Sequence, residues 1–249
     1  MKITAIKTFV MDAFRTNWTF VKVETDAGLH GWGEASLGTQ EGALSGCVED
    51  LKRLIVGRDP REIERMCFEV YRDIYWKGGP VLMSAISGIE MAMWDITGKY
   101  FNAPVYALMG GKMRDSVRMY ANAWFVGARS PEEFAAAARK AVALGVTALK
   151  WDPFGKAHMT IGNRGLDLAA AIVGAVREAV GPEVDLLIEC HGRFNGYTAL
   201  RVSAQPAPSG FEADSVVCSS TNRNNGRTAW DAKDEIIGRR NCQNIGTAA

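Results

Sequence analysis

The stretch of sequence that decides the fold runs from Ala85 to Gly111 and reads AISGIEMAMWDITGKYFNAPVYALMGG. Apolar residues recur in it at the spacing that places them on one face of a helix. These residues are Ile86, Ile89, Met93 and Ile96. Gly88 lies between them and permits close packing, and Pro104 is suited to the start of a second, short helix. By itself the pattern predicts a buried helix and says nothing of function.

The residues before this segment have the pattern of an α+β domain. From Lys2 to Glu34, strand-forming residues surround a turn at residues 26–28, which predicts a small antiparallel sheet with a hairpin. Helical periodicity then follows over residues 41–55, 60–75 and 81–100. Because the strands come first and the helices after them, without alternation, we expect an α+β domain.

After Gly111 the predicted strands and helices alternate. We expect strands over residues 117–125, 146–151 and 184–190, and helices over 131–144 and 166–180. Alternation at this spacing is typical of βα units on a parallel sheet, as in a (β/α) TIM-like barrel. The helix over 131–144 has a clear start signal, with Ser130 as N-cap, a proline at the first helical position and Glu133 completing a capping box.

The chain is therefore expected to contain two domains that meet near residue 115. Residues 1–115 would form an α+β capping domain, and residues 116–201 would form the first βα units of an incomplete barrel. Residues 204–249 contain no leucine, methionine or tyrosine. We expect residues 202–249 to be an atypical, disordered tail, and our hypothesis for its origin is a shift of the coding frame after Phe194 or Arg201.

Composition limits the class of partner. The 249 residues carry 29 lysines and arginines against 28 acids, so the overall charge does not favour nucleic acid or an anionic membrane. Five widely spaced cysteines form no C-x-x-C pair, and no apolar run approaches the roughly 20 residues that span a bilayer. We therefore expect a cytoplasmic protein whose partner is a small molecule.

Two of the expected barrel strands end in ionisable residues. Lys150 and Asp152 lie two positions apart and point to the same side of the second strand, while Glu189, His191 and Arg193 follow the third. Residues at the carboxyl ends of barrel strands face the active site, and polar groups there are costly unless they are paired or bind something. On the residues alone, surface positions and a turn-starting Asp-Pro remain a sufficient explanation.

The segment 85–111 closely resembles the first signature of the mandelate racemase and muconate lactonizing enzyme family, in the enolase superfamily. The matching positions are Ala85, Glu90, Ala92, Asp95, Gly98, Lys99, Pro104, Leu108 and Gly110. The resemblance covers residues 1–200, and the end of the third barrel strand is similar to the galactonate dehydratase branch. Glu90 and Asp95 are expected to be structural, because their helix belongs to the capping domain.

The resemblance implies a Mg²⁺-dependent dehydratase of a sugar acid such as galactonate, which removes the proton α to the carboxylate and then eliminates the β-hydroxyl. It implies that Glu189 is a Mg²⁺ ligand, that His191 is the general acid, and that Lys150 contacts the substrate or removes a proton. Asp152 and Arg193 are expected to bind the substrate. Such an ion would stabilise an enediolate, and an ordinary histidine pKa of about 6.5 suits proton donation near neutral pH.

In the capping domain, residues 14–19 match the place where this family's specificity loops lie over the barrel mouth. The resemblance therefore implies that Asn17 and Trp18 contact the substrate, although the alternative that they simply begin a strand stays open. Members of the family form symmetric assemblies, so a homo-oligomer is expected.

Two alternatives stay open. A racemase or cycloisomerase of the same superfamily is disfavoured by His191 and by Asp152, which stands where a second lysine often occurs in this family. A non-catalytic fragment is the other alternative, because the acidic strand ends expected near positions 215 and 241 are not found. Asp214, Asp234 and Glu235 are present, but not in strands that could aim them at a shared ion. Since one carboxylate rarely holds Mg²⁺ alone, we expect little or no turnover from the chain as written.

Overall fold

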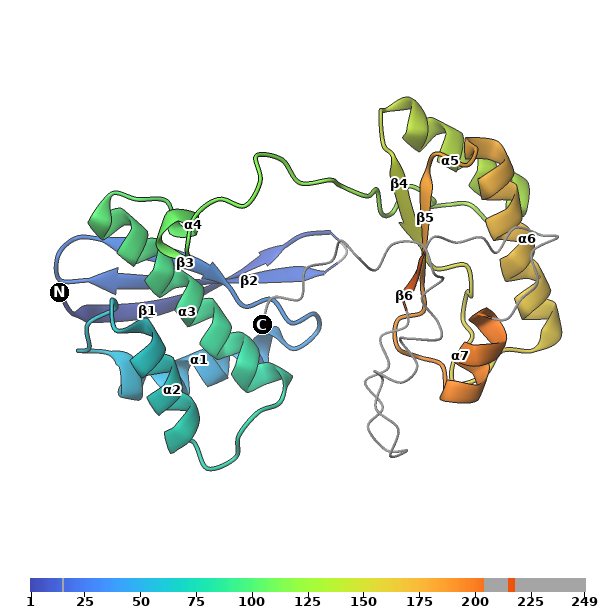
Figure 1. The fold of residues 1–249 in the computed structure, drawn as a ribbon. Coiled ribbons are helices and arrows are strands. Elements are labelled where there is room, and N and C mark those ends of the chain that lie inside the picture. Colours follow the sequence, from blue (N-terminus) through green and yellow to red (C-terminus); the bar gives the residue numbers. More distant parts are fainter. Residues whose placement is uncertain (15, 204–214, 218–249) are drawn as a thin grey trace. The chain divides into compact units, whose positions relative to one another are not determined.

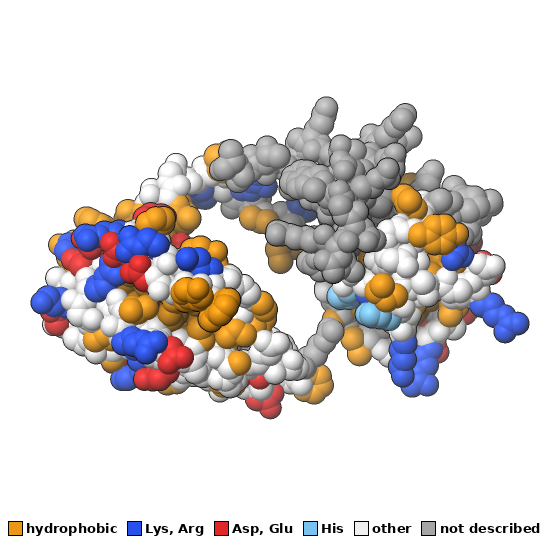
Figure 2. All heavy atoms as spheres, turned by 90° about the horizontal axis from the view of Figure 1, so that it is seen from below, with side chains coloured by type: hydrophobic (Ala, Val, Ile, Leu, Met, Phe, Trp, Pro, Cys, Tyr) orange, Lys and Arg blue, Asp and Glu red, His pale blue; other side chains and the backbone are white. Residues whose placement is uncertain are grey.

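The computed structural model describes residues 1–14, 16–203 and 215–217. The chain divides into two compact units, Met1–Asp115 and Ser116–Ala249, and each has a hydrophobic core of its own (Figure 1). Over the first unit, acidic and basic side chains intermingle on the face seen in Figure 2, so that face has no large area of one charge. Within the described ranges, every helix is too short or too polar to cross a membrane.

The first unit has the predicted order of strands followed by helices. Its elements are β1 (Ile3–Asp12), β2 (Asn17–Thr25), β3 (His30–Glu34), α1 (Glu41–Ile55), α2 (Ile63–Asp73), α3 (Pro80–Phe101) and α4 (Val105–Leu108). The strands form an antiparallel sheet in the order β1-β2-β3, with Val23 opposite Ile6 and Gly31. The α+β prediction for this part of the chain is confirmed.

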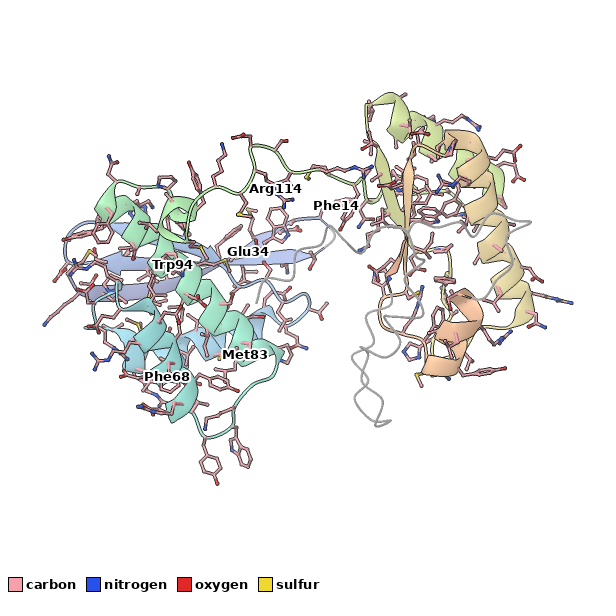
Figure 3. All side chains as sticks on the ribbon, in the orientation of Figure 1. Phe14, Glu34, Phe68, Met83, Trp94 and Arg114 are labelled. Atoms are coloured by element: carbon pink, nitrogen blue, oxygen red, sulfur yellow. The ribbon has the colours of Figure 1, made fainter. Side chains whose placement is uncertain are left out.

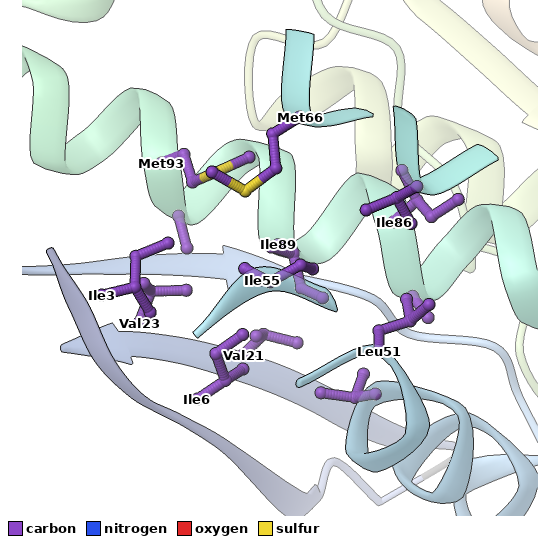
Figure 4. Packing of buried hydrophobic residues seen from close by; sticks show 14 of the residues in the cluster. Ile3, Ile6, Val21, Val23, Leu51, Ile55, Met66, Ile86, Ile89 and Met93 are labelled. Atoms are coloured by element: carbon purple, nitrogen blue, oxygen red, sulfur yellow. The ribbon is translucent and has the colours of Figure 1, made fainter. Parts of the chain in front are cut away.

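Helices α1, α2 and α3 cover one face of this sheet, and the core lies between them (Figures 1 and 4). On β2 every second side chain is buried, which is the period of a strand with one covered face. On α1 the buried residues recur every three or four positions, as on a helix with one apolar face. They are Leu44, Val48, Leu51 and Ile55. Burying each of these aliphatic side chains stabilises the fold by about 1.5–3 kcal/mol.

Glycines allow α3 to lie directly against β3. A Cβ atom placed on Gly31 would lie 2.0 Å from the carbonyl oxygen of Ala92, and one on Gly33 would lie 1.9 Å from that of Gly88. On the helix itself, a Cβ on Gly88 would lie 2.7 Å from the Cβ of Ala35. No larger residue fits at these positions without moving the backbone, so the close packing predicted for Gly88 is confirmed.

Asp95 joins the same two elements by hydrogen bonds. Its Oδ2 accepts from the backbone nitrogen of Trp32 at 3.0 Å and from Lys99 Nζ at 2.8 Å. Lys99 Nζ in turn donates to the carbonyl oxygen of His30 at 2.8 Å. The structural role expected for Asp95 is therefore confirmed, since its contacts bind α3 to β3.

The second unit contains βα units on a parallel sheet. Its elements are α5 (Pro131–Ala143), β4 (Ala148–Trp151), α6 (Asn163–Val180), β5 (Asp185–Glu189), α7 (Gly196–Ser203) and β6 (Ser215–Val217). The strand order is β4-β5-β6, and Leu187 pairs with Lys150 on one side and Ser215 on the other. Helices α5 and α6 lie side by side against the sheet (Figure 1). The predicted incomplete barrel is confirmed.

The strand expected over residues 117–125 is much shorter in the structure. It is reduced to one parallel bridge, in which Ala121 accepts from the backbone nitrogen of Lys150 at 2.9 Å. Directly afterwards Ala123 adopts a left-handed backbone with φ of 58°, which ends the extended chain. The turn lets Trp124 pack edge-to-face against Phe134 of α5, so tertiary packing overrides the strand pattern.

The predicted capping box at Ser130 is present. The backbone nitrogen of Glu133 donates to Ser130 Oγ at 3.4 Å, and that of Ser130 donates to Glu133 Oε2 at 3.2 Å. Of the tail predicted over residues 202–249, the first two residues end α7 and residues 215–217 form β6. The rest of that prediction, and the frame-shift hypothesis with it, concerns residues outside those that the structure describes.

Candidate active site

The predicted site residues of the second unit gather where β4 and β5 end. Because the two strands are parallel, their carboxyl ends lie at the same edge of the sheet. Lys150 belongs to β4 and Glu189 is the last residue of β5, while Asp152, His191 and Arg193 follow directly after these strands. The structure therefore brings five of the seven predicted site residues together at one edge.

Lys150 and Glu189 form an ion pair between the strands. Lys150 Nζ lies 2.5 Å from Glu189 Oε2, and the two side chains are 19% and 12% exposed. Burial raises the pKa of the Glu189 carboxyl, but Lys150 and the backbone N–H of His191 lower it, and the net pKa is below the usual value. The hydrogen bond to Glu189 also raises the pKa of Lys150. Both groups are therefore held in their charged forms.

Asp152 is the centre of a second group of contacts. Its Oδ2 lies 2.8 Å from Nδ1 of His191, and both of its oxygens contact the guanidinium of Arg193. Its Oδ1 also accepts from the backbone nitrogen of Phe154 at 2.9 Å. A single guanidinium nitrogen, Nη2, contacts both oxygens, and a contact between two charged groups is stronger than one between neutral groups.

The loop over residues 153–162, which joins β4 to α6, is fixed to the segment that follows β5. Arg193 Nη1 donates to the carbonyl oxygen of Gly155 at 2.9 Å. The backbone nitrogen of Met159 donates to the carbonyl of Arg193 at 2.8 Å, and that of Asn195 donates to the carbonyl of Met159 at 3.0 Å. These bonds connect two consecutive βα units at the edge where the ionisable residues lie.

His191 is held in an uncommon backbone conformation. Its φ is 51°, in the left-handed region that few residues other than glycine adopt, although histidine tolerates it better than most. The backbone nitrogen of His191 donates to Glu189 Oε1 at 2.7 Å, which stabilises this turn directly after the strand. The side chain is 62% exposed, so the imidazole is accessible from solvent. Strained residues of this kind cluster at functional sites.

Tyr120 is a neighbour of the site that sequence reasoning missed. Lys150 Nζ lies 5.6 Å from the centre of the Tyr120 ring, within the range of a cation–π contact. The pairing of Ala121 with Leu149 brings Tyr120 beside Lys150. A parallel alignment of the two expected strands could have indicated this contact, because side chains alternate between the faces of a sheet and those of Tyr120 and Lys150 fall on the same face.

Asn17 and Trp18 belong to the first unit, at the start of β2. They pair with Asp12 and Met11 of β1, and Trp18 is 44% exposed and packs edge-to-face on Phe20. Both residues thus begin a strand, as the alternative reading of the sequence had it. Their contact with a substrate stays a prediction.

The first unit also has a hollow of about 420 Å³ between the end of β3 and the start of α3. Glu34 and Met83, labelled in Figure 3, contribute to its lining. Glu34 is the single ionisable residue among the lining side chains, so the hollow offers no acid–base pair. The candidate active site is therefore the edge of the second unit's sheet.

Magnesium requires six oxygen ligands in near-octahedral geometry, usually with one or two carboxylates and several waters. Glu189 is the predicted ligand, but its Oε1 accepts from the backbone of His191 and its Oε2 pairs with Lys150. Across residues 1–14, 16–203 and 215–217, no three His, Cys, Asp or Glu side chains form a group that could hold a metal ion. The described residues by themselves do not fit the ion.

Comparison with known proteins relates both units to one family. Residues 3–110 match the model of the mandelate racemase / muconate lactonizing enzyme N-terminal domain, and residues 133–212 match that of the enolase C-terminal domain-like family. A crystal structure of a protein from Mesorhizobium loti superposes with a TM-score of 0.87 at 33% identity. That match covers 95% of this chain and 64% of the other.

Two curated relatives are sugar-acid dehydratases by name. D-gluconate dehydratase of Thermoproteus tenax is 41% identical over 189 residues, which are 76% of this chain and 38% of that protein. D-galactonate dehydratase of Pectobacterium atrosepticum is 36% identical over 195 residues, which are 78% of this chain and 50% of that protein. The chain thus spans half or less of the length of these two relatives.

Proposed function

This chain belongs to the mandelate racemase and muconate lactonizing enzyme family of the enolase superfamily, and from that premise we propose that it functions in the dehydration of a sugar acid. The observation that carries the proposal is the grouping of Lys150, Glu189 and His191 at the carboxyl ends of two adjacent parallel strands. D-gluconate and D-galactonate are the substrates to test, because the two curated relatives bear their names.

The proposed reaction removes two groups from neighbouring carbons. A base takes the proton from C2, next to the carboxylate, and the hydroxyl leaves C3 as water after it receives a proton. We assign the base to none of the described residues, because the ammonium of Lys150 is ion-paired and charged. The resulting enol becomes a ketone at C2, so the product is a 2-keto-3-deoxy acid. We assign the proton donated to the C3 hydroxyl to His191, whose exposed imidazole can reach a ligand at this edge.

We assign to Lys150 the stabilisation of negative charge on the substrate. In the structure Lys150 is ion-paired with Glu189, so its ammonium is already charged. A charged ammonium is suited to contact the substrate carboxylate or the enediolate that forms when the C2 proton leaves. Removal of a proton would require a neutral amine. The ion pair therefore favours the substrate-contact role of Lys150 over its role as a base.

Racemisation is a weaker proposal for the same site. A two-base racemase needs a second base across the substrate, and in this chain Asp152 stands where a second lysine often occurs. The contacts of Asp152 with Arg193 and His191 leave it poorly placed to act as that base. Magnesium dependence, a homo-oligomeric assembly and substrate contacts from Asn17 and Trp18 remain predictions.

The experiment uses the full chain with D-gluconate or D-galactonate and MgCl₂ in D₂O. Proton NMR follows exchange at C2, and a keto-acid assay follows dehydration. Because little turnover is expected of the chain as written, we expect slow C2 exchange and a low yield of product, both above the level without protein, with at least one of the two sugar acids. His191→Asn should retain exchange but reduce product formation by about 10²–10⁴-fold, because only the second step needs its proton.

The matched control is His158→Asn, which changes another exposed histidine of the second unit and should leave both readouts unchanged. The proposal is wrong if the folded chain exchanges no C2 proton of either sugar acid. Inversion at C2 without product would instead support a racemase.

A further inference from the structure

We propose that Asp152 is a positioning residue, which fixes the His191 ring with its proton on Nδ1 so that Nε2 is the nitrogen that meets the substrate. The inference rests on the proposed function for the role of His191. It replaces the substrate-binding roles that the family resemblance implies for Asp152 and Arg193. Four sets of contacts at the ends of β4 and β5 support it.

The carboxylate of Asp152 is already occupied by donors of the protein. It accepts from the backbone nitrogen of Phe154, contacts Arg193 through both oxygens, and lies within hydrogen-bond distance of His191 Nδ1. A carboxylate has about four acceptor positions, so these donors use most of its capacity. Its side chain is only 16% exposed. Little of the carboxylate is left for a substrate hydroxyl.

The guanidinium of Arg193 is occupied in the same way. Nη2 contacts the carboxylate of Asp152, and Nη1 donates to the carbonyl oxygen of Gly155 at 2.9 Å. The remaining Nε is buried and has no hydrogen-bond partner among the described residues. The Arg193 side chain as a whole is 16% exposed. Arg193 therefore joins Asp152 to the loop over residues 153–162 instead of facing a ligand.

His191 is fixed at two points. Glu189 Oε1 accepts from its backbone nitrogen at 2.7 Å, which supports the left-handed backbone, and Asp152 Oδ2 lies 2.8 Å from Nδ1 of the ring. No described residue forms a hydrogen bond with Nε2, and 62% of the side chain is exposed. The ring thus presents Nε2 to whatever binds at this edge.

Chemistry decides which nitrogen carries the proton. In a neutral imidazole one nitrogen donates and the other accepts, and the partner of one nitrogen sets the state of the other. A carboxylate held by an arginine can only accept, so Nδ1 of His191 must be the donor toward Asp152. Nε2 is then the ring nitrogen without a partner among the described residues, and it is the one that faces a ligand at this edge.

The test measures the protonation of each ring nitrogen by long-range ¹H–¹⁵N NMR on the full chain labelled with ¹⁵N-histidine, at about pH 8, where an ordinary histidine is neutral. The chain has three histidines, so the His191→Gln variant assigns the His191 signals by their disappearance. We expect a protonated Nδ1 in the wild-type chain. Asp152→Asn should shift the His191 ring toward the form with the proton on Nε2.

The matched control is Asp167→Asn, which makes the same change at an exposed position on α6 and should leave the His191 signals unmoved. A neutral His191 with an unprotonated Nδ1 in the wild-type chain would overturn the proposal without any variant. If Asp152→Asn does not fold, Arg193→Gln supplies the comparison. This variant keeps the contact between Asp152 and His191 and should keep the proton on Nδ1. An unprotonated Nδ1 in the variant would mean that Asp152 does not determine which ring nitrogen carries the proton.

This readout needs no turnover, so it separates the inference from the proposed function. A protonated Nδ1 together with no C2 exchange on D-gluconate or D-galactonate would contradict the proposed function alone. C2 exchange together with an unprotonated Nδ1 would contradict only the role of Asp152.

Discussion

The ammonium of Lys150 lies 2.5 Å from Oε2 of Glu189, so two neighbouring parallel strands end in one ion pair. Both side chains are largely buried, which means that water cannot easily replace either partner. Each charge therefore depends on the other more than in a surface pair, where the net contribution to stability is commonly below about 1 kcal/mol.

Replacement of Lys150 by methionine should destabilise the second unit. The change leaves Glu189 as a largely buried carboxylate without its cation, which should lower the free energy of unfolding by about 1–3 kcal/mol. Urea denaturation in EDTA measures this. The double variant Lys150→Met, Glu189→Gln should recover part of the loss, because no unpaired charge remains. Strictly additive effects of the two changes would show that the pair contributes nothing.

Replacement of Gly33 by alanine should destabilise the first unit. The new Cβ would lie 1.9 Å from the carbonyl oxygen of Gly88, so α3 or β3 must move, and overpacking of this kind costs about 1–3 kcal/mol. Gly46→Ala on α1 is the matched control, because its Cβ meets nothing within 4 Å. It should stabilise the helix by up to about 1 kcal/mol. Thermal unfolding of both variants should therefore give opposite signs.

The ionised Glu24 carboxylate should stabilise the fold near neutral pH and lose this contribution in acid. Hydrogen bonds from Lys7 and then Lys22 lower its pKa from 4.5 to about 2. A lowered carboxyl pKa stabilises the fold above the unfolded value and loses that contribution as the pH falls through the folded value. The difference in Tm between wild type and Glu24→Gln should be full at pH 6, shrink below pH 4.5 and vanish near pH 2. Glu64→Gln, exposed on α2 without an ion pair among the described residues, is the control, and an equal pH dependence in both variants would contradict the assignment.

Ser130→Ala should shorten or weaken α5. The variant loses the side-chain oxygen that accepts from the backbone nitrogen of Glu133, and loss of such a cap costs about 0.5–2 kcal/mol. Ser45→Ala, inside α1, should instead be neutral or slightly stabilising, since alanine favours helix interiors. Hydrogen exchange of the first-turn amides of α5 measures the local effect. Unchanged protection of the Glu133 amide would mean that the cap is not formed in solution.

Local sequence signals predicted much of the fold. The apolar period of α3, the capping residues at Ser130 and the alternation of strands and helices after residue 115 all act over a few neighbouring residues, so periodicity reveals them. The prediction that Lys150 and Glu189 lie at one edge followed in the same way, because parallel strands end together.

The contacts of Asp152 could not be predicted in this way. A turn with a left-handed residue and backbone hydrogen bonds between two loops bring together Asp152, His191 and Arg193. Neither feature produces a periodic pattern in the sequence. The prediction of a strand over residues 117–125 was wrong for a related reason. Trp124 packs on Phe134 of α5 instead of continuing the strand, and this contact between distant residues is visible only in the assembled core.

The contacts at the ends of β4 and β5 also have a consequence for the kinetics of binding. Two cations, Lys150 and Arg193, neutralise two anions, Asp152 and Glu189, so the group carries no net charge while His191 is neutral. A sugar-acid anion approaching this edge is not attracted from a distance by these residues, and the rate of its encounter with them should depend little on ionic strength. If a sugar acid binds here as proposed, its carboxylate would pair with Lys150 or Arg193 only by displacing a carboxylate that is already in place.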